Sequence, residues 1–254
     1  MQRQHHTKGI ILKKEQRSEF DYAVTLFSPE LGKIKATAKG SRKITSSFCG
    51  HLETLNICNF QLYQTPYRFT ILQCQTETNF KAIRADLQKS LFAMLLLEIF
   101  EKSTYSDEHG AELYQLLEST LTQINNGQQY FLEIEEFKLK LLNFMGVLPD
   151  IKNCSFCHKP WLQTNGQPNV WLNQDGHLSC DECSHKLIKP SKIDFSVIKL
   201  IAHLTFQDKP QKNIRMDSLQ KNRLQQISNQ FLNNYLDQEM RSPKVIAGLS
   251  NVDY

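Results

Sequence analysis

Two periodicities divide this chain into a first part that predicts β-strands and a second part that predicts helices. Five short stretches rich in β-branched and aromatic residues predict strands at residues 9–14, 22–28, 33–39, 51–64 and 67–77. In the third stretch, KIKATAK, charged and polar positions alternate with Ile34, Ala36 and Ala38, so one face of the strand is basic and the other small and apolar. Turn signals with Pro29 and Pro66 separate neighbouring strands. Five short strands in about eighty residues predict a small barrel.

Helical spacing replaces this alternation after about residue 85. Apolar residues that recur every three or four positions predict helices near residues 86–99, 111–124, 130–144, 194–206 and 216–240. Gly146 is a plausible stop for the third helix, and Asp194 or Ser196 can cap the fourth. We therefore predict an α+β chain with two domains, 1–82 and 83–254.

The composition is typical of a soluble globular protein. Of 254 residues, 40% are hydrophobic and 22% are charged, which allows a sizeable core. The longest apolar run, Leu91 to Leu97, is far shorter than the roughly 18–20 residues of a membrane span. The first residues contain no apolar stretch typical of a secretory signal. We therefore expect a cytoplasmic protein without membrane association.

The charge is unevenly distributed along the chain. Residues 1–85 contain 13 Lys and Arg against 6 Asp and Glu, a net charge of +7. Residues 86–185 carry −8, and residues 186–254 carry +5. Two basic segments thus flank an acidic one. A basic segment of this size is compatible with a polyanionic partner, although lysines are also common on ordinary soluble surfaces.

The cysteines are the strongest chemical signal. Four of the seven form two C-x2-C pairs with 22 residues between the pairs: Cys154, Cys157, Cys180 and Cys183. Such pairs on tight turns direct four thiolates at one tetrahedral centre, so they predict a structural Zn²⁺ site in an insertion spanning about residues 150–188. The remaining three lie among apolar residues, and we expect them in the core: Cys49, Cys58 and Cys74.

The sequence gives little support for an enzyme. A site with four cysteine ligands leaves no open position for a reacting water, which a catalytic zinc needs. His51 and Glu53 match the H-x-E part of a base-deaminase motif, but neither cysteine pair is preceded by the required proline. A redox role for one C-x2-C pair is a further alternative. Three histidines near the pairs are expected to be exposed or to surround the ligands: His158, His177 and His185. Three glutamates are expected on the polar edge of the third helix: Glu133, Glu135 and Glu136.

Several of these segments, in this order and spacing, resemble RecO, a family of bacterial recombination mediators. Within residues 9–55, the resemblance rests on an acidic turn at Glu19–Asp21, the SPELG turn, the KGSR segment at 39–42, a Ser-rich loop and a Leu-Glu pair. The stretch DGHLSCDEC, which contains the second cysteine pair, and the stretch YLDQEMRSPKVI at 235–246 extend it nearly to the end of the chain.

The resemblance implies an N-terminal OB-fold barrel, followed by a helical domain that carries the zinc site. It also implies a non-enzymatic DNA repair protein that binds single- and double-stranded DNA and anneals complementary strands. With RecR, such proteins help to load RecA onto DNA coated by single-strand-binding protein, whose acidic C-terminal tail would find a basic partner in residues 186–254. Such a protein would associate with the nucleoid when it acts on DNA.

Basic residues of the predicted barrel are the candidates for contacting DNA: Lys13, Lys14, Arg17, Lys33, Lys35, Lys39, Arg42 and Lys43. Aromatic residues near them could stack on bases, although packing in the core is the alternative for each: Phe20, Tyr22, Phe48 and Tyr67. A solvated barrel face is the alternative for each lysine. A rival hypothesis for the whole chain is a zinc-ribbon and OB module that binds RNA or takes part in transcription.

Overall fold

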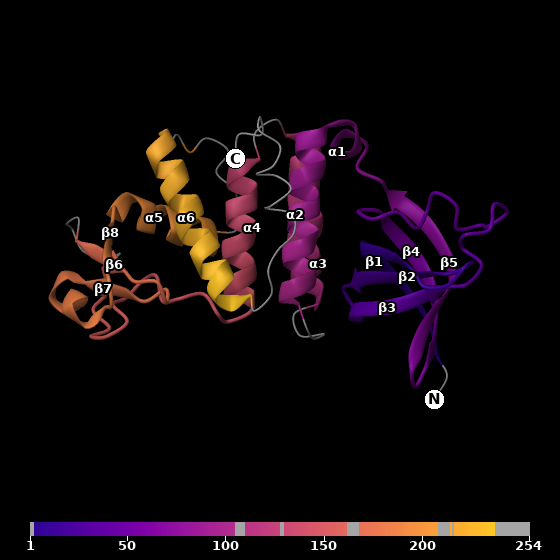
Figure 1. Cartoon of the computed structure of the whole chain (residues 1–254), viewed down its shortest axis with the longest axis horizontal. Helices are drawn as coiled ribbons and strands as arrows, with labels where there is room; N and C mark the ends of the chain where they lie inside the picture. The colour runs from indigo at the N-terminus through magenta and orange to yellow at the C-terminus, as the bar shows by residue number, and fades with distance from the viewer. Residues whose placement is uncertain are drawn as a thin grey trace. The chain divides into compact units, whose positions relative to one another are not determined.

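The structure, a computed structural model, describes residues 3–104, 110–127, 130–161, 168–207, 214 and 216–236. The described residues form two compact units, one up to Tyr130 and one from Phe131 onward. The first contains the strands of the N-terminal part and three helices, and the second contains the remaining helices and the cysteine region (Figure 1). The sequence-based division into domains at residue 82 follows the change in periodicity and stays a prediction.

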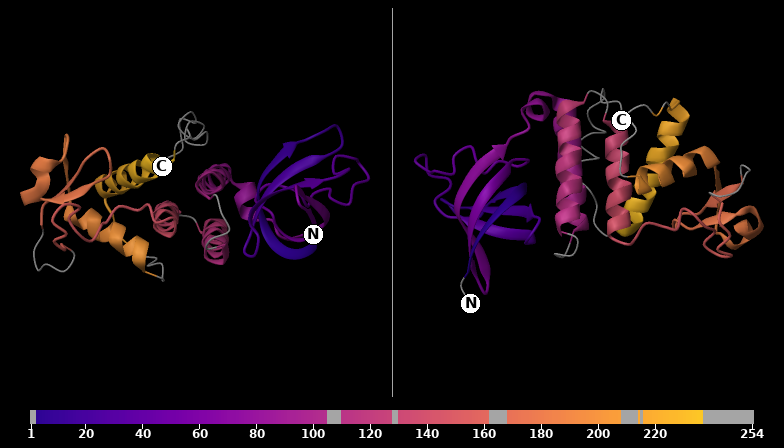
Figure 2. Two further views of the ribbon diagram at one scale, coloured as in Figure 1. Left: turned by 90° about the horizontal axis from the view of Figure 1, so that it is seen from below. Right: turned by 180° about the vertical axis from the view of Figure 1, so that it is seen from behind.

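The first unit is built on a closed five-stranded barrel (Figure 2). Its strands are β1 (Arg3–Gln16), β2 (Tyr22–Ser28), β3 (Gly32–Ala38), β4 (Ile57–Thr65) and β5 (Arg68–Thr78). They close in the order β1-β2-β3-β5-β4, and only the β3–β5 pair is parallel. A five-stranded Greek-key barrel of this kind is the OB-fold, so the predicted fold class is confirmed.

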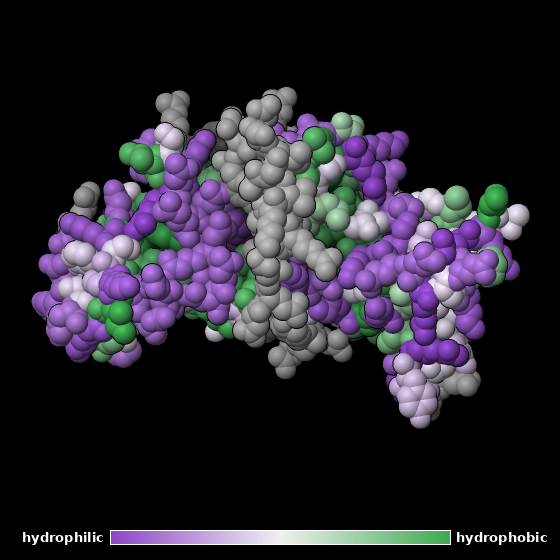
Figure 3. Space-filling model, in the orientation of Figure 1, coloured by the Kyte–Doolittle hydropathy of each residue, from purple (hydrophilic) through white to green (hydrophobic). Residues whose placement is uncertain are grey.

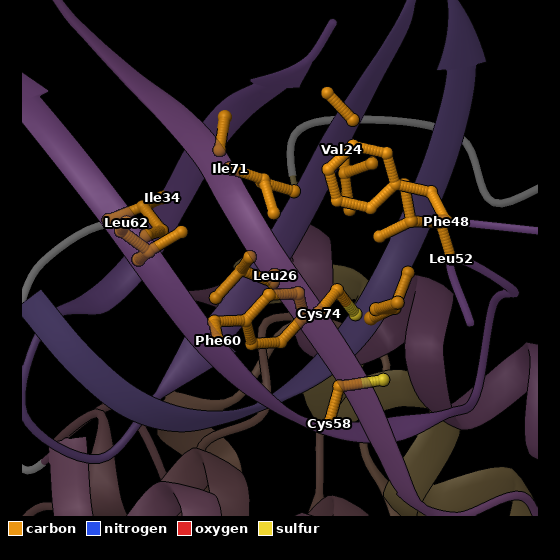
Figure 4. Close-up of a cluster of buried hydrophobic side chains, with 13 residues drawn as sticks. Val24, Leu26, Ile34, Phe48, Leu52, Cys58, Phe60, Leu62, Ile71 and Cys74 are labelled. Carbon is orange, nitrogen blue, oxygen red and sulfur yellow. The ribbon is translucent and has the colours of Figure 1, made fainter. Parts of the chain in front are cut away.

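Alternation along the strands builds the core of the barrel. Ile34, Ala36 and Ala38 of β3 point inward and are 8%, 1% and 0% exposed, as the KIKATAK pattern predicts. They pack with inward-facing residues of the other strands, including Leu26 and Phe60 (Figure 4). On the face drawn in Figure 3, hydrophilic residues cover most of the outer surface of the barrel.

The segment between β3 and β4 differs from the sequence-based expectation. The strand predicted from residue 51 begins only at Ile57, because residues 51–56 form turns around Leu55, which has a positive φ of 77°. The segment places Phe48 in the barrel core, 9% exposed, so this aromatic is not available for stacking on a base. The prediction for the three isolated cysteines is confirmed for Cys58 and Cys74, whereas Cys49 is exposed.

Three helices complete the first unit: α1 (Lys81–Ala85), α2 (Leu87–Ser103) and α3 (Gly110–Asn126). The Asp86 side chain caps α2 by accepting a hydrogen bond from the Lys89 N–H at 2.9 Å. Phe100 of α2 packs edge-on against Phe27 of β2, with ring centroids 4.8 Å apart. Gly110 lies so close to the β2–β3 turn that a Cβ there would come within 2.7 Å of the Pro29 carbonyl oxygen. These contacts hold α2 and α3 against the barrel.

The second unit contains α4 (Phe131–Phe144), α5 (Phe195–Phe206) and α6 (Ser218–Tyr235). Its cysteine region consists of the short strands β6 (Val170–Leu172), β7 (Leu178–Cys180) and β8 (Ser191–Ile193) with the 3₁₀ helix η1 (Asp181–Lys186). Two end signals are confirmed: Gly146 takes a φ of 69° after α4, and Asp194 caps α5. The last helix was predicted to extend to residue 240, and residues 237–240 lie outside the described residues.

One prediction about α4 is wrong. Glu135 does not lie on a polar edge: it is fully buried and forms an ion pair with the equally buried Lys138, at 2.8 Å. Ser228 of α6 donates a hydrogen bond to the second carboxylate oxygen of Glu135, and Asn229 accepts one from Lys138 at 2.8 Å. Because every charged atom of the pair has a partner, the α4–α6 contact can hold two charges.

In the part of the chain that the structure describes, no helix combines the length and the apolar character needed to cross a membrane.

Candidate functional site

The four paired cysteines converge in the second unit. The sulfur atoms of all four lie within 4.8 Å of one another: Cys154, Cys157, Cys180 and Cys183. The Sγ atoms of Cys157 and Cys180 are 3.8 Å apart. A tetrahedral zinc with Zn–S bonds of about 2.3 Å places its sulfur ligands about 3.8 Å from each other. The donor set and its spacing thus fit a metal ion of the zinc type.

Local backbone geometry prepares these thiols for a cation. Burial raises the pKa of the Cys154 thiol, but the backbone N–H groups of Cys157, Cys180 and Phe156 outweigh it and lower that pKa to about 6. Burial and the neighbouring thiols raise the pKa of Cys183 to about 12. Burial and the neighbouring thiols thus oppose the simultaneous ionisation of all four sulfurs when no cation is bound. A divalent metal would supply the missing positive charge and release the remaining protons.

Each C-x2-C pair forms a short segment that we call a knuckle, the first at residues 154–157 and the second at residues 180–183. A small sheet supports both knuckles. β6 pairs with both β7 and β8, and β7 leads directly into η1, which contains Cys183. The Ser155 N–H donates to the Leu178 carbonyl at 2.9 Å, which ties the first knuckle to β7. The four sulfurs connect the first C-x2-C turn with the end of β7 and with η1, so a metal bound there would hold these segments together.

The barrel presents basic residues of β1 and β3 on the outer face, on either side of β2. Lys13 of β1 pairs with Thr25 of β2, which pairs with Lys35 of β3, so the two lysines flank a small residue in one row. In the next row, Arg17 reaches across to donate a hydrogen bond to the Thr37 hydroxyl. We call this surface, together with Lys14 and the loops at 17–21 and 39–44, the basic face.

Two carboxylates neutralise part of the basic face. Glu15 pairs with Lys13 at 2.8 Å and with Lys35 at 3.2 Å, and the hydrogen bond from Lys13 is the main reason that its pKa is lowered. Lys14 pairs with Glu53 at 2.8 Å. Exposed pairs of this kind contribute little to stability and are screened by salt, so phosphates can compete for the lysines.

Lys33 differs from the other predicted DNA contacts. Its ammonium donates to the Glu101 carbonyl near the C-terminus of α2, at 2.6 Å, where the helix dipole favours a cation. Burial lowers the pKa of Lys33. Its location indicates that Lys33 attaches α2 to the barrel, although its role at a DNA site stays a prediction.

The two loops of the basic face are tied to each other. Arg42 donates to the carbonyl oxygens of Ser18 and Glu19, at 3.0 and 2.7 Å. Asp21 accepts the Gly40 N–H at 2.8 Å, and this hydrogen bond lowers the pKa of the Asp21 carboxyl. Gly40 itself needs a positive φ of 63°. The two loops therefore form one connected edge, with the exposed Lys39 and Lys43 beside it.

Two of the predicted aromatic residues lie among these cations. Lys43 lies 5.6 Å from the ring centre of Phe20, which is 48% exposed. Tyr22 has Lys14 at 4.9 Å from its ring centre and Arg42 at 5.8 Å. Tyr67, at the tip of the β4–β5 hairpin, is 95% exposed. The structure therefore brings aromatic rings and most of the predicted cations to the loops of the barrel and to the surface of its strands.

The second unit contains a pocket whose residues the sequence analysis did not identify. It has a volume of ≈ 340 Å³, and its lining combines the cationic Lys199 and the imidazole of His203 with Val197, Leu200 and Met216. Within the described residues, the buried Nε2 atom of His203 has no hydrogen-bond partner. The spacing along α5 was the available signal, because Lys199 and His203, four positions apart, share a helix face.

Comparisons with known proteins cover nearly the whole chain. The sequence model described as "Recombination protein O N terminal" matches residues 1–80, and the one described as "Recombination protein O C terminal" matches residues 84–244. Similar curated proteins include the DNA repair protein RecO of Dehalococcoides mccartyi, which is 32% identical over 78% of this chain and 77% of its own length. RecO of Thermoanaerobacter sp. is 25% identical over 97% of this chain and 98% of its own. RecO of Syntrophus aciditrophicus is 27% identical over 95% of each chain.

Proposed function

The chain belongs to the RecO family of DNA repair proteins, and from this premise we propose that it is a non-enzymatic mediator of homologous recombination. In this role it binds single- and double-stranded DNA in the cytoplasm, at the nucleoid. The observation that carries the proposal is the basic face of the barrel, with exposed aromatic residues at its loops. OB-folds bind oligonucleotides through the same elements.

The DNA site that we propose uses the basic residues predicted from the sequence, with Lys33 in a supporting role beside α2. Lysines and arginines on the basic face neutralise phosphates, and Phe20 and Tyr67 offer exposed rings to unpaired bases. Because such contacts do not read base edges, binding is tolerant of sequence and falls steeply with salt.

Strand annealing follows from the same electrostatics. Two complementary strands repel each other through their phosphates, and a basic surface that holds one strand lowers the cost of bringing the second close. The bases must remain free to pair, which suits a shallow face better than a deep cleft. No bond is made or broken in this process, so it needs no catalytic residue and no nucleotide.

We also propose partners for the second unit. The pocket beside Lys199 and His203 joins a cation to an apolar lining, a combination suited to an acidic peptide that ends in an aromatic residue, such as the tail of single-strand-binding protein. Binding that tail would bring the chain to coated DNA, where, together with RecR, it would help RecA to load. The four-cysteine site holds Zn²⁺ in this proposal and stabilises the fold around it, without contributing to a reaction.

An annealing assay tests this function. Complementary oligonucleotides, one carrying a fluorophore and the other a quencher, are mixed with the full chain, with and without single-strand-binding protein. We expect faster annealing than without the chain, and an affinity for single strands that falls several-fold between low and moderate salt. The charge reversal Lys35→Glu should weaken both, whereas the same reversal at the exposed Lys81 of α1, which is not among the residues of the basic face, should not. Binding unaffected by salt would contradict the electrostatic mechanism. A preference for structured RNA without annealing would favour the rival RNA-binding or transcription-associated module.

A further inference from the structure

The first cysteine knuckle carries a large aromatic side chain at the surface. Phe156 lies between the two ligands Cys154 and Cys157, and it is 36% exposed. Two other large side chains of the same region, Trp161 at 2% and Leu178 at 0%, are buried, whereas Ile188 is 74% exposed. Leaving a phenyl ring 36% exposed gives up part of the burial that would otherwise stabilise the region.

Two polar groups from distant segments surround this ring. The imidazole of His177, in the β6–β7 turn, has its ring centre 6.4 Å from that of Phe156, at an angle of 47°. The ammonium of Lys186, at the end of η1, lies 5.5 Å from the ring centre. The first knuckle, the β6–β7 turn and η1 thus contribute one residue each to a single surface patch, which we call the knuckle patch.

The backbone of the knuckle patch is firmly held. Ser155, directly before Phe156, is hydrogen-bonded to β7 through its N–H, and its hydroxyl accepts the Leu178 N–H at 3.3 Å. The His177 N–H donates to the Asn173 side chain at 2.9 Å. Cys157 follows Phe156 directly and belongs to the sulfur cluster. Binding a ligand on this ring therefore requires little ordering of the backbone.

We propose that the knuckle patch is a second contact for single-stranded nucleic acid, in which Phe156 stacks on an unpaired base and Lys186 contacts a neighbouring phosphate. Every nucleobase offers a flat π-face, and an aromatic ring beside a cation is the combination that single-strand-binding surfaces use. The inference rests on the proposed DNA binding and extends it from the barrel to the second unit. Duplex DNA has no free base to stack, so this contact selects unpaired strands.

Fluorescence anisotropy of the full chain with a labelled oligothymidylate and an abasic strand of the same length tests the inference. We expect Phe156→Ala to weaken binding of the oligothymidylate about fivefold or more, and to leave the abasic strand and duplex DNA unaffected. Phe156→Tyr should restore the affinity. Lys186→Ala should weaken both single strands alike, because it removes a phosphate contact. Leu219→Ala, which removes another exposed apolar side chain of the second unit, is the matched control.

A purely structural role for Phe156 makes a different prediction. If the ring only shields the sulfurs, Phe156→Ala would lower the metal content, and Phe156→Leu, which keeps the apolar bulk, would behave like the wild type with both strands. We expect instead that Phe156→Leu keeps its metal and loses the preference for strands with bases. Equal affinities of wild type and Phe156→Leu for the oligothymidylate would overturn the knuckle patch while leaving the barrel site intact. Failure of the wild type to bind either single strand would refute the proposed function itself.

Discussion

Replacing Lys138 by methionine removes the positive partner of a buried carboxylate and keeps most of the side chain's length. Both charged side chains are 1% exposed, and the ammonium lies 2.8 Å from Glu135 and 2.8 Å from Asn229. After the substitution, Glu135 keeps the hydrogen bond from Ser228 but has no counter-charge and no water around it. Breaking a buried pair in this way costs about 3–5 kcal/mol. Because a typical domain is stable by about 5–15 kcal/mol, the second unit of this variant should lose a large fraction of its free energy of unfolding.

A second substitution separates the charge from the shape. In the double variant Glu135→Gln with Lys138→Met, no charge is buried, and the amide oxygen can still accept the Ser228 hydroxyl. We expect the double variant to be more stable than Lys138→Met alone, because the penalty comes from an unpaired buried charge. The same change in an exposed pair is the control: Lys159 and Glu182 are 3.8 Å apart with side chains 62% and 77% exposed, so Lys159→Met should cost about 1 kcal/mol or less.

Urea unfolding followed by tryptophan fluorescence measures these differences. The chain has two tryptophans, Trp161 and Trp171, and both belong to the second unit, so the signal reports on that unit without interference from the barrel. The midpoint and the slope m of each transition together give the free energy of unfolding of each variant. The reasoning would be refuted if Lys138→Met stayed within about 1 kcal/mol of the wild type, or if the double variant were no more stable than Lys138→Met.

Three further predictions follow from single contacts. Gly110→Ala should destabilise the first unit by about 1–3 kcal/mol, because the added Cβ would lie 2.7 Å from the Pro29 carbonyl oxygen. A thermal melt followed by circular dichroism measures the change, and Glu112→Ala, at an exposed position of the same helix, should leave the stability unchanged. Asp194→Ala should cost about 1 kcal/mol at neutral pH, since it removes the cap of α5. The hydrogen bond from the Ser196 N–H lowers the pKa of Asp194 in the folded state. The stabilising effect of the cap is therefore present above the unfolded-state pKa and is lost as the pH falls through the lowered folded-state pKa. A difference in urea midpoint between wild type and Asp194→Ala that stayed constant into acid would contradict the assignment. Cys154→Ser should reduce the bound metal from about one ion per chain towards none, as measured by elemental analysis, and should unfold the second unit first. A variant that stayed folded and metal-loaded but lost all DNA binding would contradict a structural role.

The sequence determined those features that depend on neighbouring residues. The alternation in KIKATAK fixed which face of β3 is buried, because successive strand residues point to opposite sides. Asp194 and Gly146 marked a helix start and a helix end, because caps and left-handed turns are local requirements. The spacing of the cysteines predicted their convergence, since each C-x2-C pair is a local turn with two thiols on one side.

The tertiary structure alone decided what each side chain meets. Lys33 and Lys35 share a face of β3, yet Lys33 binds the Glu101 carbonyl of α2, 68 positions away, and only Lys35 remains on the basic face. Glu135 looked like a surface residue of an amphipathic helix until Lys138 and Ser228, the latter 93 positions away, enclosed it. Burial and charge pairing depend on segments brought together by folding, and periodicity within one segment carries no information about those partners.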